Sequence, residues 1–180
     1  EVIPAAMAYI GLDPASTDPD DLEEGAEVVE AVREHIRYFH SSQYITDLAN
    51  GDVCVSVGWS GDLFQAQARA IEAENGVDIV YTIPNEGALV WFDMLAIPVD
   101  APNPDAAHAF INFTMDAQIN ADITNYVWYA NGNKASQPLL EEVLLGDTSV
   151  YPSEEGLKNL YIVTPYEPRV QRQVTRLWTR

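Results

Sequence analysis

The stretch VCVSVGWSGD, residues 53–62, decides the fold class. The valines of residues 53–57 are typical of a strand, in which Cys54 is predicted to be a small buried side chain. The turn of residues 58–62 follows, and it leads into a predicted helix that ends near Asn75. In α/β proteins, ligands bind where a strand passes through a glycine-rich turn into a helix. The stretch therefore predicts an α/β fold with a candidate ligand site at this turn.

The rest of the chain is predicted to contain further strands as well as helices. An acidic stretch at residues 13–24 is predicted to be a solvated loop and helix start, and it does not have the ligand spacing of a calcium loop. Asn103-Pro104-Asp105 indicates the start of a packed helix. Two further strands are expected at residues 77–83 and 88–97, and helices at residues 2–11, 26–39, 43–49, 106–115 and 117–125.

Composition excludes several classes of protein. The chain has 180 residues with 28 acidic against 9 basic side chains, which gives a net charge of −19. Nucleic-acid binding depends on clustered Lys and Arg, so no nucleic-acid partner is expected. Hydrophobic residues make up 47%, enough for a packed core at this length. No apolar run approaches the roughly 18 residues that span a bilayer.

Aromatic and acidic side chains occur together at several points of the chain. Such pairs suit a primary alkylammonium ligand, because carboxylates satisfy its three N–H donors while ring faces pack on its methylenes. The carboxylates are expected to dominate the binding energy, and the aromatic rings to set the length and shape of the pocket. The candidate residues are Trp59 with Asp62, Trp91 with Asp93, and the aromatic group Tyr126, Trp128 and Tyr129.

Structural roles compete with this interpretation. Asp62 follows Gly61 and is equally well placed to be a helix N-cap, and Trp59 and Trp91 are also candidates for the core. Asp93 lies inside an apolar segment, where a buried unpaired carboxylate would be costly, and this favours a functional role.

An enzymatic alternative would use Asp62 and Asp93 as a general acid and base, as in a hydrolase, or His35 or His40 with a serine nucleophile. No catalytic, phosphate-binding or metal-binding motif supports it, so no enzyme, metal or cofactor is predicted. For the two histidines, which are expected at a helix end and a turn, a solvated or capping role is favoured over catalysis.

Six stretches of the chain carry a resemblance to a known family: residues 39–45 (FHSSQYI), 48–55 (LANGDVCV), 58–62 (GWSGD), 91–98 (WFDMLAIP), 129–135 (YANGNKA) and 175–179 (TRLWT). They resemble the polyamine-binding proteins of bacterial ABC importers, most of all the putrescine-binding members. The similarity extends over nearly all of the chain and includes the specific turn GWSGD.

The resemblance implies a type II periplasmic solute-binding protein fold, in which two lobes close on the ligand about a hinge. It further implies that the chain is a fragment that lacks most of the first lobe. Residues 1–80 are then expected in the second lobe, residues 81–130 in a segment that returns to the first, and residues 131–180 in C-terminal helices of the second lobe.

The resemblance also implies the function and the site. We expect capture of a polyamine, putrescine above all, in the periplasm by a monomer that delivers it to a membrane permease. Asp62, Asp93 and Glu1 would pair with the ammonium ends, while Trp59, Trp91 and Tyr129 would enclose the carbon chain. Putrescine-specific relatives often have Phe at position 91 and spermidine-binding ones tend to have Trp, so a spermidine preference is an open alternative. A polyamine sensor with the same site is another.

Overall fold

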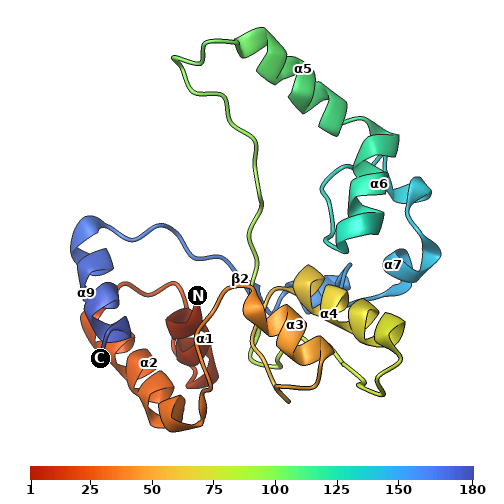
Figure 1. The fold of residues 1–180 in the computed structure, drawn as a ribbon. Helices are drawn as coiled ribbons and strands as arrows, with labels where there is room; N and C mark the ends of the chain where they lie inside the picture. The colour runs from red at the N-terminus through yellow and green to blue at the C-terminus, as the bar shows by residue number, and fades with distance from the viewer. The chain divides into compact units, whose positions relative to one another are not determined.

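The computed structural model describes residues 1–180 (Figure 1). These residues form two units, and each unit is built from more than one segment of the chain. The first unit contains Glu1–Phe39, Ile83–Phe92 and Glu154–Arg180, and the second contains His40–Thr82 and Asp93–Ser153. The chain therefore passes between the units after residues 39, 82, 92 and 153. None of the helices combines the length and the apolar character that a membrane crossing requires.

The first unit is built on three helices. Ile3 and Met7 of α1, Leu22 of α2 and Leu177 of α9 form its buried core. At the surface, Gln173 Nε2 donates to the carbonyl of Pro19 at 3.0 Å, which ties α9 to the start of α2. The elements of this unit are α1 (Val2–Tyr9), α2 (Pro19–Val32), the 3₁₀ turn η1 (Arg33–His35), β1 (Ala88–Leu89), α8 (Glu154–Leu157), β2 (Leu160–Tyr161) and α9 (Pro168–Trp178).

Local chemistry explains why α2 begins earlier than the apolar spacing predicts. Asp18 accepts a hydrogen bond from the backbone N–H of Asp20 at 2.9 Å, and Pro19 occupies the first helical position. An N-cap carboxylate and a proline directly after it are a strong helix start. The helix therefore includes part of the acidic stretch and ends at Val32, so the prediction of a helix over residues 26–39 was wrong at both ends.

The second unit carries the turn of residues 58–62. Its main core joins Tyr44 and Leu48 of α3 to Leu63, Ala66 and Ala70 of α4, with Ile79 added from the segment after α4. Its elements are α3 (Gln43–Ala49), α4 (Ser60–Ala73), α5 (Pro104–Thr114), α6 (Ala117–Val127), the 3₁₀ turn η2 (Gln137–Leu139) and α7 (Glu142–Gly146). The predicted helix over residues 43–49 is confirmed.

The predicted strands are the main departure from expectation. Residues 53–57 and 77–83 run without strand pairing, and of residues 88–97 only Ala88–Leu89 forms a strand, parallel to Leu160–Tyr161. A strand exists only when a neighbour completes its backbone hydrogen bonds, and the valine pattern supplies the propensity but not the neighbour. Cys54 is consequently exposed rather than buried, and Val55 remains 86% exposed.

Helix α5 also differs from its prediction. Its start at Pro104 confirms the signal of Asn103-Pro104-Asp105, but the helix contains no buried residue. Phe110 is 58% exposed and Phe113 is 56% exposed, so the packed helix expected from their spacing is not present. The apolar spacing predicted the helix correctly and overestimated the burial of its apolar side chains.

The two units divide the chain after residues 39, 82, 92 and 153, whereas the lobe boundaries were predicted at residues 80 and 130. The units are defined by contacts within this chain, and they do not test which segments belong to which lobe. Assignment of segments to the lobes of a solute-binding protein rests on the resemblance and stays a prediction.

The core of the first unit predicts a large effect for one substitution. Leu22 is fully buried among α1, α2 and α9, so Leu22→Ala should lower the free energy of unfolding by about 3 kcal/mol through a cavity. Val32, at the end of the same helix, is 47% exposed, and Val32→Ala should cost less than about 0.5 kcal/mol. Denaturant titration measures both. Equal losses for the two variants would show that Leu22 does not hold these helices together.

Candidate functional site

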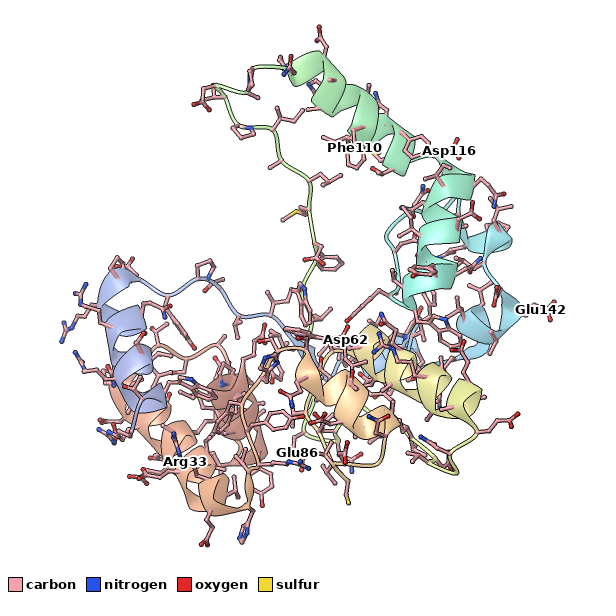
Figure 2. All side chains as sticks on the ribbon, viewed as in Figure 1. Arg33, Asp62, Glu86, Phe110, Asp116 and Glu142 are labelled. Atoms are coloured by element: carbon pink, nitrogen blue, oxygen red, sulfur yellow. The ribbon has the colours of Figure 1, made fainter.

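Asp62 lies in the first turn of α4, and Figure 2 shows it at the start of that helix. The helix begins at Ser60 with Trp59 in the N-cap position, so Asp62 is not the cap, and the N-cap alternative was wrong. A carboxylate in the first turn of a helix is stabilised by the partial positive charge of the helix N-terminus. The side chain is therefore available for contacts outside the helix.

Both oxygens of Asp62 accept hydrogen bonds from tyrosines. The Tyr44 hydroxyl donates to Oδ2 at 2.7 Å, and the Tyr129 hydroxyl donates to Oδ1 at 3.1 Å. The Tyr44 oxygen in turn accepts the backbone N–H of Trp59 at 3.3 Å, which fixes the direction of its own proton. Helix α3, helix α4 and the loop after α6 thus meet at one carboxylate.

Two glycines make room for these tyrosine rings. A Cβ atom on Gly58 would lie 2.5 Å from Cε2 of Tyr44, and a Cβ atom on Gly61 would lie 2.2 Å from Cε2 of Tyr129. Neither distance is possible between real carbon atoms, so any larger side chain would displace the ring. The glycines of the turn Gly58-Trp59-Ser60-Gly61-Asp62 are therefore required by the close approach of the two rings.

The surroundings keep both phenols protonated. Burial, followed by the hydrogen bond to Asp62, raises the pKa of Tyr44 well above its ordinary value. Burial, followed by the charge of Asp62, raises the pKa of Tyr129 in the same direction. A protonated phenol donates one hydrogen bond, and a carboxylate offers about four acceptor positions. Asp62 therefore keeps acceptor capacity for a cationic ligand after both tyrosines have bound.

Asp93 belongs to the same unit and lies in a segment without regular structure. Its side chain is exposed, so the sequence argument that it is a buried, unpaired carboxylate was wrong. Its negative charge nevertheless contributes to the raised pKa of Tyr129, which places the carboxylate within electrostatic range of that phenol. The second unit thus contains Trp59, Asp62, Asp93 and Tyr129, and two carboxylates act on one tyrosine.

The remaining predicted site residues, Trp91 and Glu1, belong to the first unit. Trp91 is 42% exposed. Glu1 occupies the N-cap position of α1, where its side chain makes no capping hydrogen bond. The role of both residues in a site stays a prediction.

Sequence reasoning missed Tyr44. Its position in α3 predicts a core residue, and it is indeed only 4% exposed. A buried phenol normally needs a hydrogen-bond partner, and this rule was the available signal that Tyr44 bonds a polar group nearby. The identity of that group, 18 residues further along the chain, depends on how α3 packs on α4.

The geometry disfavours the hydrolase alternative. His40 Nδ1 accepts the backbone N–H groups of Ser42 at 3.1 Å and Gln43 at 3.0 Å, so this histidine caps the start of α3. The capping role predicted for it is confirmed. His35 is an exposed residue whose Nε2 lies 3.7 Å from Glu34. Both oxygens of Asp62 are engaged by phenols, and no histidine contacts them.

Comparison with known proteins gives the family. The model of the bacterial extracellular solute-binding proteins matches residues 3–144. The chain is 47% identical over 180 residues to the putrescine-binding periplasmic protein SpuD of Pseudomonas aeruginosa, and 44% identical over 181 residues to the putrescine-binding periplasmic protein PotF of Escherichia coli. Each match covers 100% of this chain and 49% of the relative, so the chain spans about half the length of these curated relatives.

A solved structure agrees with these relatives. The spermidine/putrescine ABC transporter substrate-binding protein PotD of Streptococcus pneumoniae matches with a TM-score of 0.80 and 26% identity, over 99% of this chain and 54% of that one. The predicted α/β solute-binding fold, present here in part, is thereby confirmed. The chain belongs to the bacterial extracellular solute-binding proteins, a family of binding proteins rather than of enzymes.

Proposed function

We propose that this chain is part of a periplasmic protein that binds a polyamine, with putrescine as the preferred ligand, and delivers it to an ABC importer. The observation that carries the proposal is the pair of hydrogen bonds from Tyr44 and Tyr129 to Asp62 beside Trp59. The names of the relatives, which describe putrescine-binding periplasmic proteins, support the same ligand. The protein would act as a monomer without catalysis and would present the ligand to a permease in the membrane.

The chemistry of the site suits one end of a diamine. A primary ammonium group offers three N–H donors, and Asp62 can accept from it through the lone pairs that the phenols leave free. An ammonium about 4 Å from a carboxylate gains roughly 4 kcal/mol at an effective dielectric near 20, before desolvation is subtracted. Contact with the face of Trp59 would add about 0.5–2 kcal/mol. Asp62 therefore supplies most of the attraction, and the aromatic rings select the shape.

The other site residues enter the proposal with different support. Asp93 acts electrostatically on Tyr129 and is proposed to bind an ammonium group as well. Glu1 is proposed as a further carboxylate, and Trp91 as a ring that encloses the carbon chain. Both roles rest on the family resemblance alone. Closure of the two lobes of the natural protein would exclude water and strengthen each charge pair.

Spermidine is the second candidate ligand, because Trp91 matches the residue that spermidine-binding relatives tend to have. Competition between putrescine and spermidine in one calorimetric experiment separates the two ligands. A sensor of polyamines would bind in the same way without delivering its ligand, and a transport assay separates it from an importer component.

Substitution of Asp62 tests the proposed function directly. In the natural full-length protein, Asp62→Asn should weaken putrescine binding by at least about 30-fold, because an ammonium bound at this point loses its charged partner. Isothermal titration calorimetry measures the change. Asp105→Asn is the matched control, since Asp105 is an exposed acid in the first turn of α5 and should leave the affinity unchanged. Saturable binding that survives Asp62→Asn unchanged would remove Asp62 from the site, and no binding by the folded wild type would remove the polyamine assignment.

The glycines of the turn yield a second prediction. Gly61→Ala places a methyl group in the space of the Tyr129 ring and should weaken putrescine binding by about tenfold or more through loss of the bond to Asp62. In Gly132→Ala, in the loop that also carries Tyr129, the new methyl group would meet no atom within 4 Å, and the affinity should stay the same. Calorimetry measures affinity and circular dichroism verifies folding. If both variants bind like wild type, Tyr129 does not need the space above Gly61.

A further inference from the structure

Tyr129 reaches Asp62 from a point 67 residues further along the chain, so the position of its hydroxyl depends on the loop that carries it. This loop starts where α6 ends, and in Figure 1 that end of α6 points toward α4. A hydrogen bond of 3.1 Å is lost when the donor moves by about 1 Å. The loop must therefore be held on both sides of Tyr129.

Trp128 holds the loop on the preceding side. It ends α6 in the left-handed conformation, with φ of 59°, and its N–H donates to the carbonyl of Thr124 at 2.9 Å. Its ring lies against that of Phe64, with 5.5 Å between the centroids. Phe64 is two residues beyond Asp62 in α4, so the helix that carries the carboxylate also carries the ring that supports this side of the loop.

Asn131 holds the loop on the following side through both ends of its amide. Its Nδ2 donates to Thr124 Oγ1 at 2.8 Å. Its Oδ1 accepts from Ser136 Oγ at 3.0 Å and from the backbone N–H of Asn133 at 2.8 Å. Thr124 is 2% exposed and Ser136 is fully buried, so neither hydroxyl can exchange its partner for water without a rearrangement. One side chain thus joins α6 to the part of the loop after Tyr129.

The backbone of Asn131 makes a further connection. Its N–H donates to the hydroxyl of Tyr151 at 3.3 Å. Tyr151 packs against the cluster of Phe64, Leu144 and Val150. The two sides of the loop are therefore anchored on the same hydrophobic cluster, through the ring of Trp128 before Tyr129 and through Tyr151 after it.

We infer that Asn131 is a positioning residue that aims the Tyr129 hydroxyl at Asp62, and that it sets the affinity for the ligand without touching it. The inference rests on the proposed function for the identity of the ligand, but the aim of Tyr129 is a property of the protein alone. Removal of the amide leaves the buried Thr124 hydroxyl without its donor and the backbone N–H of Asn133 without its acceptor, whereas the Ser136 hydroxyl keeps its hydrogen bond to the carbonyl of Asn133 at 2.7 Å. The loop must rearrange to satisfy the two groups that lose their partner.

Asn131→Ala in the natural full-length protein tests the inference by two readouts. Tyrosine ¹³Cζ resonances are followed against pH, with the Tyr129 signal assigned from Tyr129→Phe. In wild type, Tyr129 should stay protonated at a pH where ordinary tyrosines ionise, whereas in Asn131→Ala its phenol should ionise closer to the ordinary value near 10. Tyr44 should keep its raised pKa in both proteins. Putrescine affinity should fall by between about 10- and 100-fold.

Two further variants keep the test decisive. Thr124→Val removes only the partner of the Asn131 amide and should shift Tyr129 and the affinity in the same direction, even if Asn131→Ala does not fold. Asn75→Ala is the matched control, because the Asn75 side chain likewise uses both ends of its amide in this unit: it donates to the carbonyl of Ala49 at 2.8 Å and accepts the backbone N–H of Val77 at 3.0 Å. It should lower stability without moving either readout.

The outcomes are distinguishable. A lower melting temperature for Asn131→Ala and Thr124→Val with unchanged Tyr129 titration would overturn the inference, because the network would then be structural only. A Tyr129 titration that shifts without any change in putrescine affinity would overturn the part that concerns affinity. If wild type binds no putrescine, the proposed function fails, and the shift of Tyr129 still decides whether Asn131 positions it.

Discussion

The paired hydrogen bonds from two phenols to Asp62 are the interaction on which the site depends. They join α3, α4 and the loop after α6 at one carboxylate, and each uses a different oxygen. Because the donors are neutral, they orient the carboxylate without cancelling its charge. A lysine or arginine in the same place would bind Asp62 more strongly and would also compete with a cationic ligand for it. Neutral donors on a fixed acid are therefore a suitable way to prepare a site for an ammonium group, and the family to which the chain belongs is one of solute-binding proteins.

Close packing around this carboxylate constrains the local sequence. Gly58 and Gly61 are needed because the rings of Tyr44 and Tyr129 occupy the space where their side chains would lie. Trp59 lies between the two glycines in the sequence, and its backbone N–H donates to the Tyr44 oxygen. The close approach of the two rings thus determines the glycines of the turn, whereas Trp59 and Asp62 are the turn residues that the proposed function places against the ligand. The packing of Trp128 on Phe64 extends the same constraint into the body of the second unit.

The sequence predicted helices better than strands, and the reason is physical. A proline acts locally, so the start of the helix at Pro104 could be predicted from a few neighbouring residues. The helix that starts at Gln43 was also predicted, but its start is capped by the His40 side chain and not by the preceding serine. A strand requires a partner from elsewhere in the chain, and residues 53–57 have the valines of a strand without that partner. In the site, Asp62 and Tyr129 could be proposed from residue type and resemblance. Tyr44 could not, because its contact with Asp62 arises from the packing of α3 on α4, and the expected burial of Asp93 failed together with the strand that was to bury it.

The most direct test is a crystal structure of the natural full-length protein with putrescine bound. One ammonium nitrogen should lie within hydrogen-bond distance of Asp62, about 2.7–3.2 Å, while Tyr44 and Tyr129 still donate to the same carboxylate. The methylenes next to that nitrogen should lie against the Trp59 ring. A structure in which putrescine occupies the protein and Asp62 contacts only its two tyrosines would contradict the assignment of this carboxylate as the ammonium acceptor.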